Sequence, residues 1–159
     1  DVMQKDINDC LPIINLIKPN NNIADLGSGG GFPGILLSIT KPGNKITLIE
    51  SNNKKCYFLR TVIDKLELKN TEVINQTITK NNNLESFDVI TARAFASIEK
   101  IINLTQKSNK KETEYSLLKG KEQKIKEELK LLDQKKYRYE IIKLDNENQE
   151  RNIVVIKNE

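Results

Sequence analysis

Histidine and tryptophan are absent from this sequence of 159 residues, and cysteine is scarce. Without histidine there is no Ser-His-Asp or Cys-His catalytic group, no imidazole general base and no histidine-ligated zinc. The two cysteines, Cys10 and Cys56, lie far apart and form no CxxC or other metal-ligand spacing. The sequence therefore predicts neither a disulfide framework nor a metal site, and a reducing compartment is the default.

Long hydrophobic segments are also missing. The longest apolar runs, such as residues 34–39, are far shorter than the ~18 residues that a membrane-spanning helix needs. The N-terminus does not resemble a signal peptide. We therefore expect a cytoplasmic protein without a membrane partner.

Charge and composition are those of a globular domain. Hydrophobic residues make up 37% of the chain and charged residues 30%, and 26 basic residues face 22 acidic ones. Most of the basic residues are lysine, and lysine, asparagine and isoleucine together indicate A/T-rich codons, so this excess is weak evidence for nucleic-acid binding. Residues 107–138 contain 11 basic and 6 acidic residues. That segment is either a solvated helix and loop or a basic flank beside a nucleic-acid site.

Short apolar segments alternate with helical patterns along the whole chain. This alternation predicts an α/β fold with a doubly wound, mostly parallel sheet and an antiparallel hairpin at the C-terminus. In the helix expected at residues 54–66, we predict Tyr57, Phe58, Val62 and Leu66 to be buried. The expected strands are residues 23–26, 45–49, 72–74, 87–92, 115–118, 139–144 and 153–156, and the expected helices are 9–18, 35–40, 54–66, 98–106 and 122–132.

A glycine-rich turn follows the first expected strand. Asp25, Gly27, Gly29 and Gly31 form an acid-x-Gly-x-Gly-x-Gly pattern, which is typical of folds that bind S-adenosylmethionine (SAM). Residues 29–34 also fit GxGxxG, the pattern of dinucleotide-binding turns. The acid favours SAM, because it would lie near the cationic methionine end, where a pyrophosphate would be repelled.

Glu50 closes the second expected strand. A carboxylate at that place can accept hydrogen bonds from both hydroxyls of an adenosine ribose. This role serves NAD and SAM equally, so Glu50 predicts a nucleoside cofactor without choosing between them.

The segment after the fourth expected strand indicates the kind of methyl acceptor. Residues 91–96 read TARAFA, which lacks both the Asn/Asp-Pro-Pro-aromatic run of amino-group methyltransferases and a nucleophilic cysteine. A ring nitrogen such as guanine N7 needs neither, because its lone pair attacks the methyl group directly and no proton is released. A chain without histidine suits this chemistry.

Several motifs together resemble the bacterial RsmG family, also called glucose-inhibited division protein B. They are DLGSGGGFPG at residues 25–34, LIES at 48–51, KK at 54–55 with FLR at 58–60, FDVITARAFA at 87–96, LKG at 118–120 and RNIVVIK at 151–157. The resemblance implies SAM-dependent methylation of N7 of a guanosine in 16S ribosomal RNA. The implied partner is 16S rRNA or the small ribosomal subunit, with a monomeric enzyme and no metal.

The resemblance also implies site residues. Arg93 would orient the SAM carboxylate or the RNA and is the expected catalytic residue, while Lys119 and Arg151 would contact RNA. The expected cofactor-binding residues are Asp25, Gly27, Gly29, Gly31, Phe32, Glu50, Ile78, Thr79 and Arg93.

This sequence departs from the family pattern at two places. Thr77 and Thr79 stand where the family usually has Arg-x-Glu, and Lys5 and Asp6 stand where it usually has Arg-His. The family's leading helical segment is missing, so we expect residues 1–159 to be a single methyltransferase domain without it. A SAM-fold protein without activity and an NAD-dependent oxidoreductase remain the alternatives.

Overall fold

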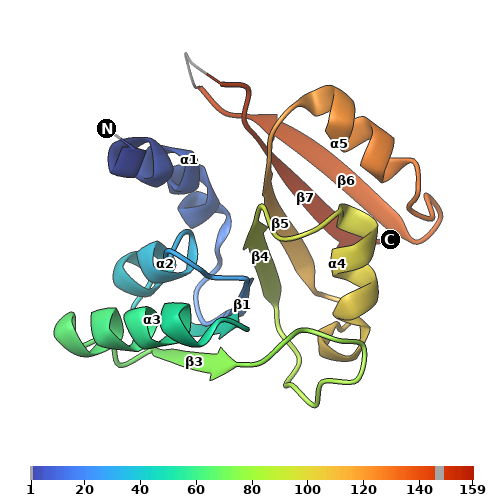
Figure 1. Ribbon diagram of the computed structural model, residues 1–159. Helices are drawn as coiled ribbons and strands as arrows, with labels where there is room; N and C mark the ends of the chain where they lie inside the picture. Colours follow the sequence, from blue (N-terminus) through green and yellow to red (C-terminus); the bar gives the residue numbers. More distant parts are fainter. Residues whose placement is uncertain (1, 146–148) are drawn as a thin grey trace.

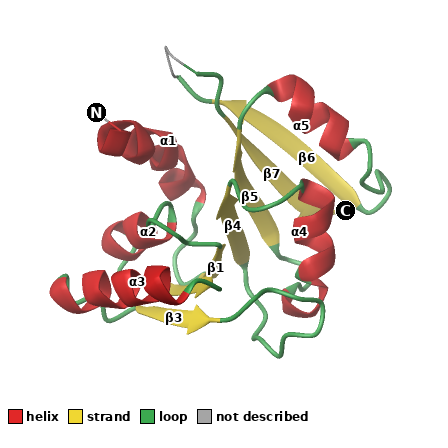
Figure 2. Cartoon of the chain, viewed as in Figure 1, coloured by secondary structure: helices red, strands yellow, loops and turns green. Residues whose placement is uncertain are grey.

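The computed structural model describes residues 2–145 and 149–159, and within them the chain forms one mixed sheet of seven strands (Figures 1 and 2). The strand order is β3-β2-β1-β4-β5-β7-β6. Strands β1 to β5 are parallel to one another, and β7 is antiparallel to both β5 and β6. The strands are β1 (Asn22–Leu26), β2 (Lys45–Glu50), β3 (Thr71–Asn75), β4 (Val89–Arg93), β5 (Glu114–Lys119), β6 (Tyr137–Lys143) and β7 (Asn152–Asn158).

Helices cover both faces of this sheet. On one face lie α1 (Val2–Leu16), α2 (Gly34–Thr40) and α3 (Asn53–Lys65). On the other lie α4 (Ile98–Leu104), a 3-10 turn (Gln106–Ser108) and α5 (Glu122–Leu129). Neighbouring residues of a strand point to opposite faces, so Ile23 of β1 packs under α1 and α2 while Ala24 belongs to the core under α4 and α5.

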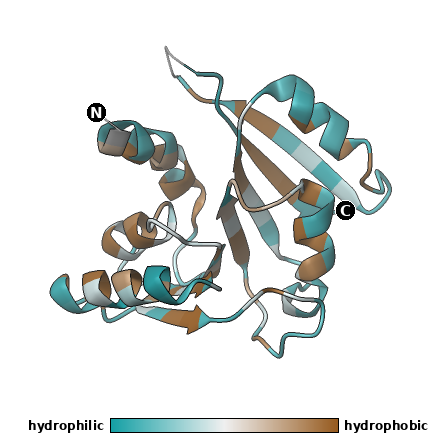
Figure 3. Ribbon diagram, viewed as in Figure 1, coloured by the Kyte–Doolittle hydropathy of each residue, from teal (hydrophilic) through white to brown (hydrophobic). Residues whose placement is uncertain are grey.

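The predicted fold class is therefore confirmed, and so is the antiparallel pairing of the last two strands. The sequence did not reveal that β7 inserts between β5 and β6. Residues 146–148, in the polar connection expected between those strands, lie outside the described residues. Figure 3 shows the inner strands β4 and β7 as mainly hydrophobic, as expected for a sheet buried on both faces, and the covering helix α5 as mainly hydrophilic.

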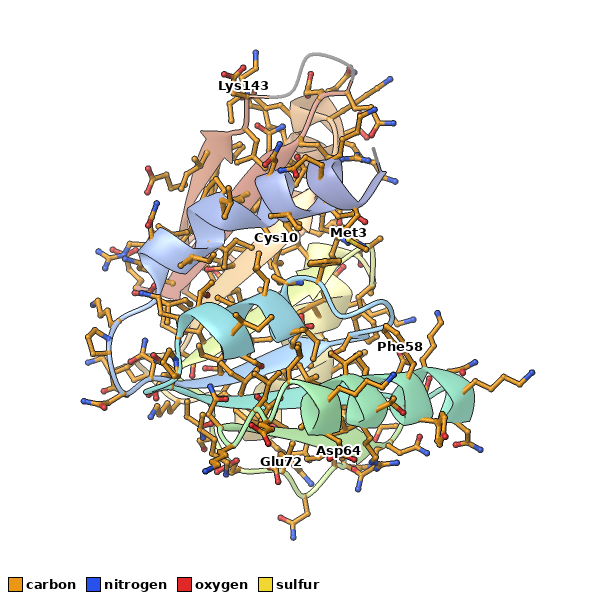
Figure 4. All side chains as sticks on the ribbon, turned by 90° about the vertical axis from the view of Figure 1, so that its left-hand side faces the viewer. Met3, Cys10, Phe58, Asp64, Glu72 and Lys143 are labelled. Atoms are coloured by element: carbon orange, nitrogen blue, oxygen red, sulfur yellow. The ribbon has the colours of Figure 1, made fainter. Side chains whose placement is uncertain are left out.

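The predicted buried side of α3 is wrong at Tyr57, Phe58 and Leu66, whereas Val62 is partly buried and packs against the core. Cys56 and Leu59 are its buried residues, whereas Tyr57 is 75% exposed and Phe58 is 48% exposed. Leu66, just after the helix, is also exposed, and Figure 4 shows Phe58 at the outer surface of the molecule. Because α3 packs near the β2–β3 edge of the sheet, it buries only a narrow stripe, and the largest apolar side chains lie beside that stripe.

Among the described residues, no helix combines the length and the apolar character needed to cross a membrane.

Candidate functional site

The glycine turn joins β1 to α2 at the edge of the sheet where the parallel strands end. Gly27, Gly29 and Gly31 have φ angles of +63°, +47° and +96°, in the left-handed region that side chains disfavour. The N–H of Gly27 donates to the carbonyl of Ile49 at 2.8 Å, which attaches the turn to the neighbouring strand β2. A Cβ at Gly30 would meet no atom within 4 Å, so this part of the turn faces open space.

Glu50 lies beside this turn, at the end of β2, and is only 7% exposed. Its Oε1 accepts from the N–H of Gly29 at 2.9 Å, and its Oε2 accepts from the N–H of Asn52 at 2.9 Å. Each carboxylate oxygen can accept a second hydrogen bond. The structure thus brings Glu50 and the glycine turn together and leaves the carboxylate able to accept from ribose hydroxyls.

Asp25 lies beneath the turn rather than on its open side. Its carboxyl group is buried, where Oδ2 accepts from the N–H of Gly34 at 3.1 Å and Oδ1 accepts from the hydroxyl of Thr91 at 2.9 Å. Burial raises the pKa of Asp25 to about 6, although hydrogen bonds from Thr91, Ser28 and Gly34 act in the opposite direction. Asp25 therefore connects β1, β4 and the start of α2, and it holds the turn from below.

Arg93, at the end of β4, lies next to Phe32 of the turn. Its guanidinium carbon is 6.0 Å from the centre of the Phe32 ring, at the limit of a cation–π contact. On its other side, Nη1 of Arg93 is 2.8 Å from Oδ1 of Asp6 in α1. The sequence marked Asp6 only as a departure from the family pattern, and no local signal indicated this ion pair across 87 positions.

The loop of residues 94–97, between β4 and α4, packs directly on the glycine turn. Ala94 has a φ of +50°, and the ring of Phe95 lies so close to Gly27 that a Cβ there would be 2.7 Å from its Cδ2. Gly27 is therefore required for this contact as well as for the turn. Sequence reasoning missed Phe95, whose only signal was its place within the TARAFA segment.

A cavity of about 740 Å³ opens beside this loop. Its walls come from α1, residues 93–97, the end of β5 and the following residues, and α5. Three of the predicted site residues line it, namely Arg93, Lys119 and Arg151, and Asp6, Asp9 and Glu128 supply acidic groups. The cavity therefore has a mixed but cation-rich wall at the same edge of the sheet as the glycine turn.

The lysine and the arginine that we expect to contact RNA differ in their surroundings. Arg151 has a side chain 40% exposed, with Nε 3.8 Å from Oδ2 of Asp9. Lys119 has a side chain only 14% exposed, and its Nζ donates to the carbonyl of Ala96 at 2.6 Å and to Oε1 of Glu128 at 3.2 Å.

Ile78 and Thr79, expected at the adenine edge, lie after β3. Ile78 is 9% exposed, and both residues line a narrow pocket of about 10 Å³ that also touches Leu26 and Ile49. The main-chain N–H of Thr79 donates to the side chain of Asn82. Their role toward adenine stays a prediction.

Metal and thiol chemistry find no support in the part of the chain that the structure describes. It contains no group of three or more His, Cys, Asp or Glu side chains placed to hold a metal ion. Both cysteines are buried and free, and burial raises the pKa of Cys10 to about 12, which disfavours the reactive thiolate.

A glycine turn after β1, an acid at the end of β2 and a cavity beyond β4 and β5 are the arrangement of SAM-dependent methyltransferases. Solved structures agree at the level of the fold. A SAM-dependent methyltransferase from Aquifex aeolicus aligns with a TM-score of 0.76 at 15% identity, over 98% of this chain and 93% of that chain. Precorrin-6y C5,15-methyltransferase from Geobacter metallireducens aligns with a TM-score of 0.71 at 15% identity, over 97% and 86% of the two chains.

The family model for GidB, rRNA small subunit methyltransferase G, matches residues 1–157, and the chain belongs to this family. Ribosomal RNA small subunit methyltransferase G of Brachyspira hyodysenteriae is 42% identical over 158 residues, covering 98% of this chain and 76% of that protein. The protein of the same name from Mycoplasma capricolum is 44% identical over 119 residues, which is 51% of its own length. The family resemblance and the methyltransferase class predicted from the sequence are confirmed.

Proposed function

We propose that this protein transfers a methyl group from SAM to N7 of a guanine in 16S ribosomal RNA. The observation that carries the proposal is the meeting of the glycine turn, Glu50 and the cation-rich cavity at one edge of the sheet, in a chain that the family model matches over residues 1–157. The small ribosomal subunit or its free RNA is the partner. We extend the proposal to a single methyltransferase domain that acts as a monomer in the cytoplasm, without a metal.

The residues around the turn fit SAM. The carboxylate of Glu50 would accept hydrogen bonds from the ribose hydroxyls, and the open space over Gly30 admits a ligand close to the backbone. Arg93 and Phe32 lie at the other end of the turn, where a cation can hold the carboxylate of the cofactor. Bound SAM supplies a methyl group on a positively charged sulfur, which is electrophilic without further activation. The residues proposed to contact it are Gly27, Gly29, Gly31, Phe32, Glu50, Ile78, Thr79 and Arg93, and Asp25 takes part in the cofactor site by holding the turn from below.

The reaction needs no general base. Guanine N7 carries a free lone pair and gives up no proton on methylation, so the protein has to orient the base and favour the in-line geometry. The acid Asp6 in the cavity wall is held in an ion pair with Arg93, and Asp25 is buried under the turn, so their contacts are structural. Arg93, at the meeting of turn and cavity, is the residue best placed to orient the reacting groups.

RNA binding would depend mainly on charge. The cavity wall includes Lys121, Lys124 and Arg151 together with Arg93, and residues 107–138 carry the excess of basic residues noted in the sequence. Phosphate contacts from such groups release counterions, so the affinity for RNA falls as salt rises.

The deciding experiment measures methyl transfer from radiolabelled SAM to small subunits that lack the modification, followed by mapping of the modified base. We expect label at N7 of one guanine, loss of transfer in Arg93→Ala, and wild-type transfer in Arg60→Ala, which removes an exposed arginine of α3. SAM binding without transfer would instead favour the SAM-fold protein without activity. Binding of NAD in place of SAM would favour the oxidoreductase.

A further inference from the structure

Lys119 lies at the end of β5 and faces the cavity, yet its charged group turns inward. Its Nζ donates to the carbonyl of Ala96 at 2.6 Å and to Oε1 of Glu128 at 3.2 Å. Both side chains of the ion pair are only 14% exposed. Two of the three N–H donors of Lys119 are thus used inside the protein, and the low exposure of the side chain leaves an RNA phosphate little access to the third.

Glu128 extends the same contact to α4. The Oε1 atom that accepts from Lys119 also accepts from the main-chain N–H of Ile98 at 2.9 Å, at the first residue of that helix. One ion pair therefore fixes two main-chain groups, the carbonyl of Ala96 and the N–H of Ile98, which lie two residues apart on either side of Ser97.

The Ala96 carbonyl and the Ile98 N–H lie at the end of the loop of residues 94–97, so their hydrogen bonds hold that end in place. The loop starts at β4 with Ala94 in the left-handed region and packs the ring of Phe95 against Gly27 of the glycine turn. Besides the apolar packing of Ala96 and Ile98 on the core, Lys119 and Glu128 supply hydrogen bonds that attach the end of this loop to β5 and α5. The loop also carries the wall of the cavity next to Arg93.

We propose that Lys119 is a positioning residue for methyl transfer, which holds the loop of residues 94–97 through the Ala96 carbonyl with Glu128 as its counter-ion. It acts in place of the RNA contact expected from the sequence. This inference rests on the proposed function, because the loop it holds borders both the glycine turn and the cavity for the acceptor base.

The test uses Lys119→Met, which keeps the length of the side chain and removes its charge, and Glu128→Gln. A carboxylate cannot bind a phosphate, so Glu128→Gln separates the two roles. Lys69→Met removes one exposed lysine elsewhere and is the matched control for charge. Each variant is assayed for the rate of methyl transfer at saturating SAM and subunit, and for RNA affinity at several salt concentrations.

We expect both Lys119→Met and Glu128→Gln to lower the saturating rate by about tenfold to a hundredfold, as misplacement of a reacting group does. The slope of log affinity against log salt should match that of Lys69→Met. The proposal is overturned when Lys119→Met reduces this slope by about one, as loss of a phosphate contact does, while Glu128→Gln keeps the wild-type rate.

A second readout does not depend on activity. Amide hydrogen exchange at Ile98 should accelerate in both site variants and stay unchanged in Lys69→Met. Lys119→Met leaves the acceptor Glu128 without its counter-ion, and Glu128→Gln replaces the charged acceptor of the Ile98 N–H by a neutral one. Unchanged exchange at Ile98 in both site variants would overturn the positioning role. Lack of methyl transfer by the wild-type protein would count against the proposed function alone, since exchange still reports whether Lys119 holds the loop.

Discussion

The glycine turn and the loop of residues 94–97 lie against each other, but they are held in different ways. The turn is fixed mainly by contacts within a short stretch of sequence, such as Gly34 to Asp25 across 9 positions and Gly29 to Glu50 across 21, although Thr91 also donates to Asp25 from β4. The loop and the neighbouring Arg93 depend on side chains from other elements, such as Asp6 across 87 positions and Glu128 across 30. The cofactor side of the site is therefore a local structure, and the acceptor side is assembled by the tertiary fold.

The largest effect on stability is expected for a substitution at Gly34, where the turn is most tightly packed. A Cβ on Gly34 would collide with the side chain of Leu48 and lie 2.5 Å from Oδ2 of Asp25. We expect Gly34→Ala to lower the free energy of unfolding by about 3 kcal/mol, because neither neighbour can move without disturbing the core. Urea unfolding measures this, and Gly30→Ala is the matched control.

Gly30 lies in the same turn but faces open space, so its substitution should change stability by less than about 1 kcal/mol. Equal losses at both glycines would show that the turn is held as a whole and not by the contact of Gly34 with Asp25.

The same contrast explains what the sequence could predict. Glycines at positions 27, 29 and 31 indicate a tight turn from the sequence alone, and in the structure all three have positive φ. Glu50 could be placed beside them because neighbouring parallel strands end at the same edge of the sheet. The parallel pairing of β1 to β5 and the covering of both sheet faces also follow from the alternation of elements.

The remaining features depend on contacts that no local pattern encodes. Asp6, Phe95 and Glu128 acquire their partners only when α1, the loop and α5 come together on the sheet. Lys119, expected to contact RNA, lines the cavity, but its ammonium group is directed to Ala96 and Glu128. The sequence can indicate that a charged residue lies near a site, but the direction of its side chain depends on the tertiary contacts.

A second prediction concerns the burial of Asp25 under the turn, which favours its protonated form. The pKa of Asp25 is raised from 3.8 to about 6, so the protonated carboxyl is favoured in the folded protein. This contribution to stability is present below about pH 4 and is lost as pH rises through 6. Asparagine does not titrate, and therefore Asp25→Asn should gain stability relative to the wild type by about 2 kcal/mol between pH 4 and pH 7.

Urea unfolding of both proteins across this pH range measures the difference. Parallel profiles would mean that the hydrogen bonds from Thr91 and Gly34 offset the cost of burial, and that Asp25 is ionised in the folded protein throughout.

A third prediction tests the cofactor function of the turn separately from its structure. Glu50→Gln keeps one oxygen acceptor for Gly29 or Asn52 and loses both the charge and the second acceptor. We expect the dissociation constant of SAM to rise about tenfold, as for the loss of one charge-assisted hydrogen bond. Calorimetric titration measures it, with Glu72→Gln on β3 as the control, because Glu72 is an exposed carboxylate of the neighbouring strand. Unchanged affinity in Glu50→Gln would remove Glu50 from the cofactor site.

The smallest effect on stability is expected for Tyr57 on α3, which the sequence pattern wrongly predicted to be buried. Tyr57 is 75% exposed, so Tyr57→Ser should change the free energy of unfolding by no more than about 0.5 kcal/mol. Leu59, two residues further on, is fully buried, and Leu59→Ala should cost about 2–5 kcal/mol through lost burial and the cavity that it leaves. Thermal and urea unfolding of the two variants compare them directly. A large loss in Tyr57→Ser would mean that this face of α3 is covered in solution, and then the helix would be governed by tertiary contacts in the same way as the loop of residues 94–97.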